Sequence, residues 1–474
     1  MILQNIIMPD STCGEQNLFY QADECLRFEN EVIKISAKKE VSFFSYMNIF
    51  DADAWKKYTW LKKVTFRIAV KGDGVIHLKS REINGDEFIA SFYAILNSWS
   101  YFFYEINLEQ THGCYYIEVQ TKSEVLIKDA CFMNTDVNVK KNDIKREINT
   151  CTYQRNREIQ RNLRQLKHSK FFCYENEFYQ KLQIIVVDNG SDLDEINEPY
   201  VKVVHNPNNG GAGGFKRGLE EIRSCQKDIS HVVFIDDDVE FQLESFYRTY
   251  ALLSYIRPKY KCESIAGRMF RTDCRQVQYT AAEIWNNGDL LHIGLNEDMT
   301  LKENILKANK NENAEYGGWW FCCYPMEFAK NNDPLPFFIH CDDVEYGLRH
   351  GGTPIILNGI QVWHETYEYR QNPIIAYYDM RNSLIVNELY NLNGDKEKVL
   401  NSWKEKISQA RVNKDYLTEY MMIRGMWDYL KGIKWLKRSN HTLYHKKLYK
   451  AKTNRYINAL LWKITELKFR KCKM

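Results

Sequence analysis

The sequence has few residues of the kinds that mark disordered, fibrous or membrane-spanning chains. Proline occurs only 9 times in 474 residues, while 44% of the residues are hydrophobic and 27% are charged, a globular composition that excludes disordered and collagen-like chains. No apolar run approaches the roughly 18 residues of a membrane span. The start, Met1 to Cys13, carries Asp10 and no basic segment, so a secretory signal is not expected either. We therefore expect a cytoplasmic protein.

Cysteine is present but lacks the spacing of a disulfide framework or a zinc site. The 13 cysteines are scattered without a Cys-x-x-Cys pair, and only Cys322 and Cys323 are adjacent. This pattern predicts reduced thiols and excludes a small fold held together by disulfides.

Acidic residues are almost absent from residues 431–474. That segment holds 14 lysines and arginines against one acid, Glu466, so it is about +13 within a chain whose net charge is +3. The apolar residues from Ile457 onward follow helical spacing, as in an amphipathic helix at a membrane interface. A peripheral anionic membrane surface and plain packing against the rest of the protein both explain the segment, whereas nucleic acid is not the expected partner.

The first part of the chain favours strands with no helices between them. Residues 64–78 alternate in hydrophobicity around a central Lys-Gly-Asp-Gly, which predicts a β-hairpin. Two aromatic-rich runs, residues 101–108 and 114–119, favour an antiparallel β-sandwich over a βαβ unit. The charged stretch Lys140 to Arg146 marks the end of this domain, residues 1–145.

Short apolar strands then alternate with helical patterns. The strands are expected at residues 183–187, 201–204 and 231–235, and the helices at residues 157–166, 214–225 and 243–255. This alternation predicts a parallel α/β sheet covered by helices over residues 146–385. After Ala376 the chain favours helix almost to its end, so residues 386–474 form the third expected region.

Polar residues follow two of the expected strands, where ligands of open α/β sheets bind. Asp188 can accept a hydrogen bond from a ribose hydroxyl or a base N–H, or can cap an ordinary turn at the end of a strand. Asn208 and four glycines, Gly210 and Gly211 among them, lie near a helix start, where backbone N–H groups approach a diphosphate or a sugar closely. The glycines match neither a P-loop nor a Gly-x-Gly-x-x-Gly fingerprint, so alone they are a weak signal.

Asp236-Asp237-Asp238, at the end of an apolar strand, is the sharpest motif. Three adjacent carboxylates repel one another unless a cation compensates their charge. Asp236 and Asp238 can point the same way and bind one Mg²⁺ or Mn²⁺, with substrate phosphates completing the shell. The alternative is an acidic turn on the surface.

A second acidic pair, Asp342-Asp343, follows the apolar run 335–339, which we expect to be a strand. A carboxylate there can be the general base that takes a proton from an attacking hydroxyl. Acids that favour a helix N-terminus produce the same pattern, so both interpretations stay open.

A histidine and a tryptophan pair complete the candidate residues. His364 follows the apolar run 355–357 and can be a third metal ligand or a structural histidine. Trp319 and Trp320 can stack on a sugar face or belong to the core.

Together, these motifs resemble those of glycosyltransferase family 2 enzymes with a GT-A fold. The matching segments, in order, are Asp188, Asn208 to Phe215, Asp236 to Asp238, Trp319-Trp320, Asp342-Asp343 and Trp363-His364. More narrowly, they are similar to bacterial galactofuranosyltransferases that build galactan, and Ser42 to Thr59 is similar to the N-terminal β-sandwich of those enzymes. The resemblance implies an α/β, Rossmann-like GT-A nucleotide-sugar domain between a β-sandwich and a helical C-terminal region.

The resemblance also implies roles for individual residues. The donor would be bound by Arg155, Asp188, Asn208, Gly210, Gly211 and Asp237, and the Mn²⁺ or Mg²⁺ on its diphosphate by Asp236, Asp238 and His364. On the acceptor side the resemblance implies Asp343 as the base with Asp342 beside it, Trp319 and Trp320 as a platform, and Glu283 as a partner of sugar hydroxyls. Two departures lie beside the base, Cys341 in place of an aromatic residue and Glu345 in place of Asp, so acceptor choice and linkage do not carry over.

The implied function is inverting, metal-dependent transfer of a sugar from a UDP-sugar to a hydroxyl of a glycan or lipid-linked glycan. Galactofuranose is the expected donor sugar by the resemblance alone. Transfer of glucose or rhamnose by the same fold, and a non-catalytic carbohydrate-binding protein, are the alternatives. A lipid-linked acceptor would place the protein at the inner face of the cell membrane, and homo-oligomerisation is left open.

Overall fold

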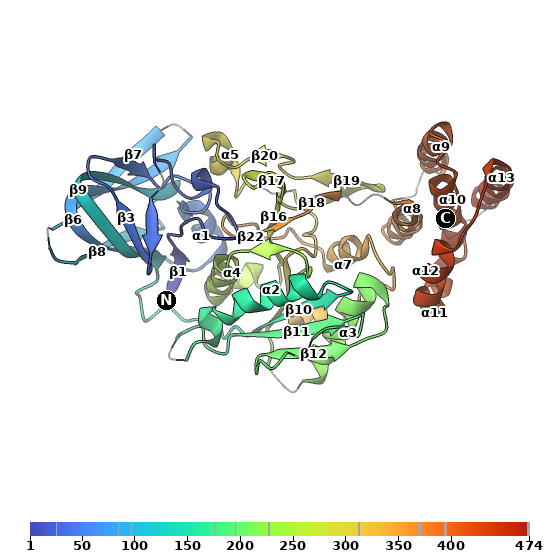
Figure 1. The fold of residues 1–474 in the computed structure, drawn as a ribbon, viewed down its shortest axis with the longest axis horizontal. Coiled ribbons are helices and arrows are strands. Elements are labelled where there is room, and N and C mark those ends of the chain that lie inside the picture. Colours follow the sequence, from blue (N-terminus) through green and yellow to red (C-terminus); the bar gives the residue numbers. More distant parts are fainter. Residues whose placement is uncertain are drawn as a thin grey trace.

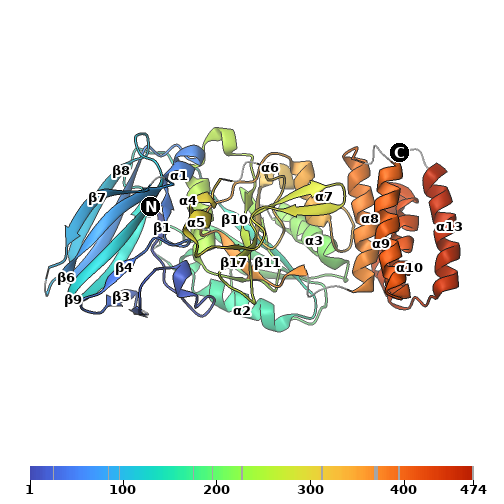
Figure 2. The same ribbon diagram turned by 90° about the horizontal axis from the view of Figure 1, so that it is seen from above.

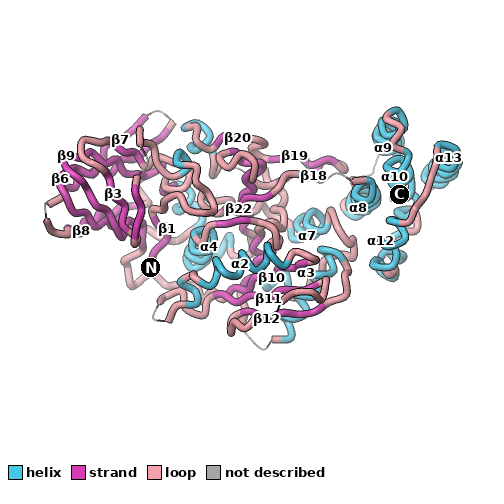
Figure 3. The backbone as a smooth tube through the Cα atoms, in the orientation of Figure 1, coloured by secondary structure: helices cyan, strands magenta, loops and turns pink. Residues whose placement is uncertain are grey.

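Three regions follow one another along the long axis of the molecule (Figure 1, Figure 2). The computed structural model describes residues 1–471 apart from residues 25, 84, 96, 175, 195, 226–227, 311–312, 368–371 and 393–395. Strands dominate one end, a mixed α/β region lies in the middle, and helices make up the other end (Figure 3). The expected fold class is confirmed in this order of regions, although the domain boundaries themselves stay predictions.

The N-terminal region is an antiparallel sheet built around two long strands, β6 (Lys63–Glu82) and β9 (Cys114–Met133). They pair from Thr65 opposite Met133 to Arg81 opposite Cys114. The other strands are β1 (Ile2–Asn5), β2 (Arg27–Glu29), β3 (Val32–Ile35), β4 (Glu40–Ser42), β5 (Phe50–Asp51), β7 (Gly85–Tyr93) and β8 (Ser100–Asn107), and one helix, α1 (Ala52–Tyr58), is included.

The hairpin expected within residues 64–78 is wrong, because these residues belong to the single strand β6. The register with β9 shifts between Gly72 and Gly74, which is a β-bulge. A Cβ atom at Gly72 would overlap the carbonyl oxygen of Glu124 on the neighbouring strand. The glycines therefore permit a close approach of two backbones within the sheet. The sequence Lys-Gly-Asp-Gly looks the same as that of a turn, although no turn is formed here.

The central region contains a six-stranded sheet in the order β12-β11-β10-β13-β21-β15. The first four strands are parallel and β21 is antiparallel to β13. The bounds are β10 (Arg146–Thr152), β11 (Leu182–Asp188), β12 (Val201–His205), β13 (His231–Phe234), β15 (Ile265–Ala266) and β21 (Cys322–Pro325). Helices α2 (Asn156–Lys167), α3 (Gly210–Ser224) and α4 (Glu244–Tyr255) connect and cover it, close to the three helices expected.

A second sheet, in the order β14-β22-β16-β17-β20, lies beside the first. Its strands are β14 (Glu240–Phe241), β16 (Arg268–Arg271), β17 (Val277–Thr280), β20 (Glu297–Asp298) and β22 (Gln361–His364). A separate hairpin consists of β18 (Glu283–Asn286) and β19 (Asp289–His292). The remaining helices of the region are α5 (Lys302–Lys307), α6 (Met326–Ala329) and α7 (Asp342–His350). β14 pairs with β22 so that Glu240 lies opposite Trp363. This pairing brings the segment after β13 next to the end of β22.

One expected strand, at residues 335–339, is absent from the described chain, and a second apolar run, residues 355–357, is not a strand either. Residues 335–339 form no strand and lead into a backbone with positive φ at Phe338 (76°). Residues 355–357 contribute only a single bridge, between Ile355 and Ile265. Residues 355–357 are buried, as are Phe337 and Phe338 of the first run, so the apolar composition of these residues reflects burial without a strand.

A buried ion pair joins the N-terminal and central regions. Arg248 and Glu244, one turn apart on α4, lie 3.0 Å apart with side chains that are almost fully buried. Glu244 accepts hydrogen bonds from the backbone and side chain of Asn5, and Arg248 donates to the carbonyls of Met47 and Asn358. One ion pair therefore ties two N-terminal segments to the α/β region.

The C-terminal region consists of six helices in the described chain. They are α8 (Pro373–Leu389), α9 (Lys396–Val412), α10 (Tyr416–Tyr429), α11 (Gly432–Arg438), α12 (His441–Tyr449) and α13 (Arg455–Lys471). α8 runs through residue 385, where a boundary was expected, and residues 472–474 of the basic segment lie outside the described residues. Among the described helices none is both long and apolar enough to cross a membrane.

Candidate active site

A cavity of about 690 Å³ opens beyond the carboxyl ends of the parallel strands, where α/β sheets bind ligands. Arg155 after β10, the start of α3 and Asp236 after β13 supply one wall, and the β18–β19 hairpin, α7, α8 and α9 supply others. Six carboxylates line it, from Asp236, Glu283, Asp289, Asp342, Asp343 and Asp379. The cavity is therefore acidic as well as rich in aromatic side chains, a combination that suits a cation and sugars.

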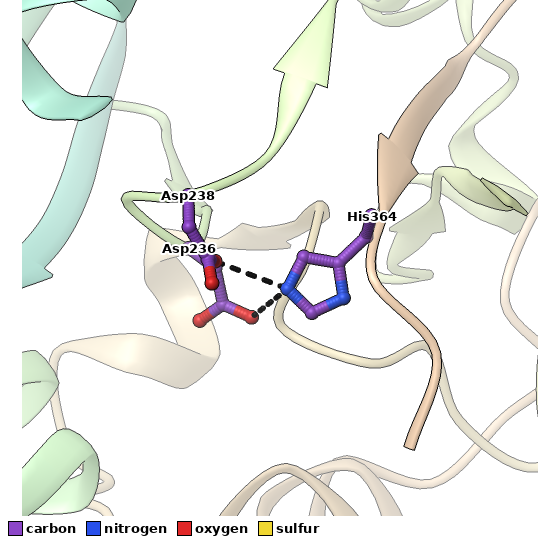
Figure 4. Close-up of side chains that lie close together, drawn as sticks. All are labelled: Asp236, Asp238 and His364. Atoms are coloured by element: carbon purple, nitrogen blue, oxygen red, sulfur yellow. Dashed lines mark hydrogen bonds and ion pairs between the residues drawn. The ribbon is translucent and has the colours of Figure 1, made fainter. Parts of the chain in front are cut away.

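Asp236, Asp238 and His364 form one cluster, with ligand atoms that all lie within 4.8 Å of one another (Figure 4). The Nε2 atom of His364 is 3.0 Å from an oxygen of Asp238 and 3.8 Å from an oxygen of Asp236. Both acids follow β13, whereas His364 ends β22, and the pairing of β14 with β22 brings them together. Two carboxylates and an imidazole are a suitable donor set for a divalent cation such as Mn²⁺ or Mg²⁺.

Arg155 lies next to this cluster at the start of α2. Its Nη1 atom is 2.9 Å from an oxygen of Asp237 and 2.8 Å from an oxygen of Asp238. Burial and the charge of Asp238 raise the pKa of Asp237 to about 6, against the opposing effect of Arg155. Asp237 is buried and pairs with Arg155, and it is not part of the cluster of Asp236, Asp238 and His364.

The glycine-rich segment begins helix α3. Gly210 has a positive φ of 73°, and a Cβ atom there would overlap the carbonyl oxygen of Phe338. The side chain of Asn208 accepts a hydrogen bond of 3.0 Å from the amide of Gly210, and Gly211 lines the cavity. Glycine at 210 therefore lets the helix start pack directly against the segment that leads to Asp342.

Asp188 is fully buried at the end of β11. One of its oxygens accepts hydrogen bonds from the amides of Gly190 and Ser191, and the other from the amide of Leu193 and faces His205 at 3.1 Å. This is the turn-capping arrangement that we expected as the alternative to a nucleotide contact. Asp188 and Asn208 are not among the described residues that line the cavity.

Asp342 and Asp343 begin α7 and line the cavity. Burial raises the pKa of Asp342 to about 6. The pKa of Asp343 is raised well above its ordinary value, first by burial and then by the charges of Asp342 and Glu283. A carboxyl group with a raised pKa is a stronger base than an exposed aspartate, as proton abstraction near neutral pH requires.

The segment before α7 has a backbone of unusual conformation. His340 and Cys341 have positive φ values of 64° and 62°, and neither is a glycine. Such conformations persist only where surrounding contacts impose them. Cys341, which departs from the family pattern, is the residue that precedes the helix.

Helix α8 supplies the contacts that hold this segment. The amide of Asn382 donates to the carbonyls of Ile339 and His340, at 2.9 and 2.8 Å. Asp379 and the ring of His340 lie 2.7 Å apart. Burial disfavours the charge of His340, but the hydrogen bond to Asp379 and the nearby carboxylates outweigh it and raise its pKa.

The two tryptophans belong to the core and also line the cavity. Trp319 is 4% exposed and packs edge-on against Phe215 and Phe234. Trp320 is 2% exposed and its Nε1 donates to the carbonyl of Gly267 at 2.8 Å. Both rings are therefore core residues that also form part of the cavity wall, and stacking on a sugar face stays a prediction.

Glu283 is also buried, at the start of β18. Its two oxygens lie 2.8 Å from Nδ1 of His292 and 2.6 Å from the hydroxyl of Tyr316. All three residues line the cavity. The carboxylate thus reaches the cavity together with two side chains that it orients.

Sequence patterns did not indicate the part of the site that the C-terminal helices contribute. Asp379 and Ser383 on α8 and Trp403 and Lys406 on α9 line the cavity. Lys406 also pairs with Asp289 of the hairpin at 2.9 Å. The available signal was a set of polar residues within the apolar α8, since buried polar side chains need partners.

Comparison with known proteins gives matches to two of the three regions. Residues 4–135 match the family described as Galactofuranosyltransferase 2 N-terminal, and residues 148–278 match Glycosyl transferase family 2. The chain is 23% identical over 387 residues to galactofuranosyltransferase GlfT2 of Mycobacterium tuberculosis, covering 75% of this chain and 59% of that protein. It is 22% identical over 435 residues to GlfT2 of Mycolicibacterium smegmatis, covering 84% of this chain and 65% of that protein.

The chain therefore spans about three fifths of the length of the curated relatives it matches. Among solved structures, a family 29 carbohydrate binding module matches with a TM-score of 0.20 and 11% identity, over 28% of this chain and 89% of that one. At that TM-score the likeness supports no argument. The chain thus contains a glycosyltransferase family 2 domain at residues 148–278, preceded at residues 4–135 by a domain that matches the N-terminal domain of galactofuranosyltransferase 2.

Proposed function

We propose that the protein transfers galactofuranose from UDP-galactofuranose to a hydroxyl group of a glycan or lipid-linked glycan, with inversion at the anomeric carbon. The observation that supports this most is that one cavity is lined both by Asp236 and His364, two members of the cluster suited to a divalent cation, and by Asp343 with its raised pKa. Family membership supports glycosyl transfer, and the names of the two relatives support galactofuranose.

Asp236, Asp238 and His364 are the residues that would hold the cation, as Mn²⁺ or Mg²⁺. When bound, the cation neutralises charge on the diphosphate of the donor and on the departing UDP. Arg155 is positioned beside the cluster to add a second positive charge on the same side. We assign Asp188, Asn208, Asp237 and the backbone of Gly210 and Gly211 to the donor side as well.

Asp343 accepts the proton of the acceptor hydroxyl in the proposed reaction. The hydroxyl oxygen forms a bond to the anomeric carbon from the face opposite the diphosphate, and the bond from that carbon to the diphosphate oxygen breaks. UDP leaves with the electron pair, and the configuration inverts. Asp342, Trp319, Trp320 and Glu283 are assigned to the acceptor, and the buried aromatic walls exclude water from the reaction.

Release of UDP tests this function. We expect UDP-galactofuranose with a galactose-containing acceptor and Mn²⁺ to give UDP release, and UDP-glucose or another UDP-sugar to give much less. The Asp343→Asn variant is the control for background hydrolysis. Equal turnover with UDP-glucose would mean that the protein is not specific for galactofuranose as the donor sugar. Binding of glycan without UDP release from any donor would favour a carbohydrate-binding protein.

The exposed face of α13 supports an anionic membrane surface as a further partner. Leu460, Ile464 and Leu467 are 63%, 41% and 52% exposed along one side of the helix. Asn458, Thr465 and Phe469 are buried on the opposite side. Lysines and arginines surround this apolar stripe, as in helices that lie in the interface of anionic membranes. A lipid-linked acceptor would then be reached by adsorption of the protein to the membrane.

A further inference from the structure

Four aromatic rings are exposed on strands β7 and β8 of the N-terminal sheet. Phe88 and Tyr93 are 58% and 67% exposed, and Tyr101 and Phe103 are 50% and 59% exposed. Each ring thus presents about half or more of its surface to solvent. Large exposed aromatic groups that share one face of a sheet are candidates for a binding site. We call these four residues the aromatic stripe.

The register of the sheet places the aromatic stripe on one face. β8 and β7 pair in succession with the same edge of β6, Phe103 opposite Arg67 and Phe88 opposite Lys79. Odd-numbered residues of β6 from 71 to 81 are partly exposed, whereas the even-numbered residues from 64 to 80 are buried. Since opposite residues in a sheet point to the same side, all four rings point outward. They extend over about 40 Å, given ~3.3 Å per strand residue.

Polar side chains alternate with the rings on this face. His77 and Ser91 form a cross-strand hydrogen bond of 2.8 Å. Tyr101 donates to a carboxylate oxygen of Asp129 at 3.4 Å, and Lys128 lies 4.5 Å from the centre of the Trp99 ring. The face therefore offers rings and hydrogen-bonding groups of both charges in one row.

We propose that the aromatic stripe binds a neutral glycan chain in an extended conformation. Sugar rings have apolar faces that pack on aromatic rings and hydroxyl groups at their edges, and the stripe supplies partners for both. A row of about 40 Å suits a linear polymer better than a small molecule, since strands set this length. The function proposed above enters only in the choice of galactan as the first ligand to test.

Two other occupants fit the stripe less well. An anionic membrane needs basic side chains that are available to lipid headgroups, whereas Lys63 and Lys79 on this face are paired with Glu105 and Glu118. A second copy of the chain would favour a compact apolar patch with few charges at its centre, whereas these rings are spread along one edge. The stripe also lies at the end of the molecule opposite the C-terminal helices (Figure 2), so its ligand does not compete with the cavity.

Affinity electrophoresis through native gels that contain soluble galactan, glucan or mannan tests the proposal without a donor. The galactan gel should slow the full chain, and Phe103→Ser or Tyr101→Ser should weaken that retention about tenfold, as expected for loss of an aromatic anchor. Tyr101→Phe keeps the ring and should retain binding. Tyr174→Ser removes a ring that is 78% exposed in the central region and is the matched control.

Unretarded migration of the full chain in all three gels, or equal retention of the stripe variants and the control, would overturn the proposal. A stripe variant that changes the molar mass in light scattering would assign the stripe to contacts between copies instead. UDP release with a short acceptor should be unchanged in the stripe variants. Glycan retention without UDP release would reject only the proposed transferase function, so the two failures are distinguishable.

Discussion

Asn382, on α8, donates a hydrogen bond of 2.8 Å to the backbone carbonyl of His340, two residues before Asp342. A second bond from the same amide, to the carbonyl of Ile339, spans 2.9 Å. These two bonds hold a backbone whose positive φ values are unfavourable without support. A helix outside the matched family 2 segment therefore positions the proposed base.

Asn382→Ala should lower kcat while UDP binding changes little. The reason is that Asp343 loses its support, and a misplacement of about 1 Å can cost on the order of 100-fold in rate. We expect a fall in kcat of about 10- to 100-fold, measured as UDP release. The matched control is Asn358→Ala, since Asn358 is equally buried and donates to the carbonyls of Tyr46 and Ile49 away from the cavity. Equal loss of kcat in both variants would mean that Asn382 stabilises the fold and does not position the base.

Asp343→Asn should keep donor binding and lower turnover by about 10² to 10⁴, because the amide cannot accept the proton. The pH dependence follows from the raised pKa of Asp343. The base works when it is deprotonated, so activity should rise with pH along a limb whose midpoint lies well above 3.8, the ordinary value for aspartate. Turnover within a few-fold of the unmodified protein would point to Asp342 as the base.

Asp238→Ala should abolish the dependence of UDP binding on divalent cations. Loss of one charged ligand should weaken cation-dependent binding by at least about 100-fold, and His364→Ala should weaken it less. Calorimetric titration of UDP with and without Mn²⁺ measures the effect. Asp228→Ala, at the other end of β13, removes an exposed carboxylate and should leave binding unchanged. Unaltered Mn²⁺-dependent binding in Asp238→Ala would mean that the cation binds at other residues.

Single substitutions of the Arg248–Glu244 pair should destabilise the protein strongly. Arg248→Met leaves the buried carboxylate of Glu244 without its partner, which costs about 3–5 kcal/mol in comparable pairs. The double variant with Glu244→Leu should cost less than the sum of the two single changes, measured by denaturant unfolding. The exposed pair Lys216–Glu220, also one turn apart at 3.7 Å, is the control and should contribute less than about 1 kcal/mol.

The apolar stripe of α13 should control membrane adsorption. Leu460→Ser with Ile464→Ser should lower sedimentation with anionic vesicles, and added salt should release the unmodified protein, since each basic side chain contributes about 1 kcal/mol near the surface. Val412→Ser, which changes a residue 74% exposed on α9, is the control. Vesicle binding that is unaffected by the double change would reject the stripe as the contact.

Point changes are preferable to removal of residues 440–474 because α12 contacts the donor side of the site. The hydroxyl of Thr442 donates to the side chain of Asn209 at 2.9 Å, and the ring of His445 lies 4.3 Å from that of Phe338. Truncation would remove these contacts, so UDP binding would be expected to change together with vesicle binding.

Local patterns were sufficient to predict much of the central region. The strands β11, β12 and β13 and the helices α2, α3 and α4 begin and end close to the expected residues, because hydrophobic periodicity is a local property. Asp236 and Asp238 were likewise predictable as one unit, since residues two apart after a strand can face the same ligand. In β6 the same kind of pattern led to the wrong prediction of a hairpin. Glycines that allow two backbones to approach each other cannot be told from glycines of a turn by sequence alone.

The sequence by itself determined the order of regions, the acidic motifs and the charge of the C-terminal segment. Only the tertiary structure decided which of these meet: His364 reaches Asp238 through the pairing of β14 with β22, and α8 closes on the segment before Asp342. It also decided the chemistry of Asp343, because its raised pKa comes from burial and from neighbours such as Glu283 that are distant in sequence. Motifs depend on residues that are adjacent in the chain, whereas burial and charge depend on everything that packs around them.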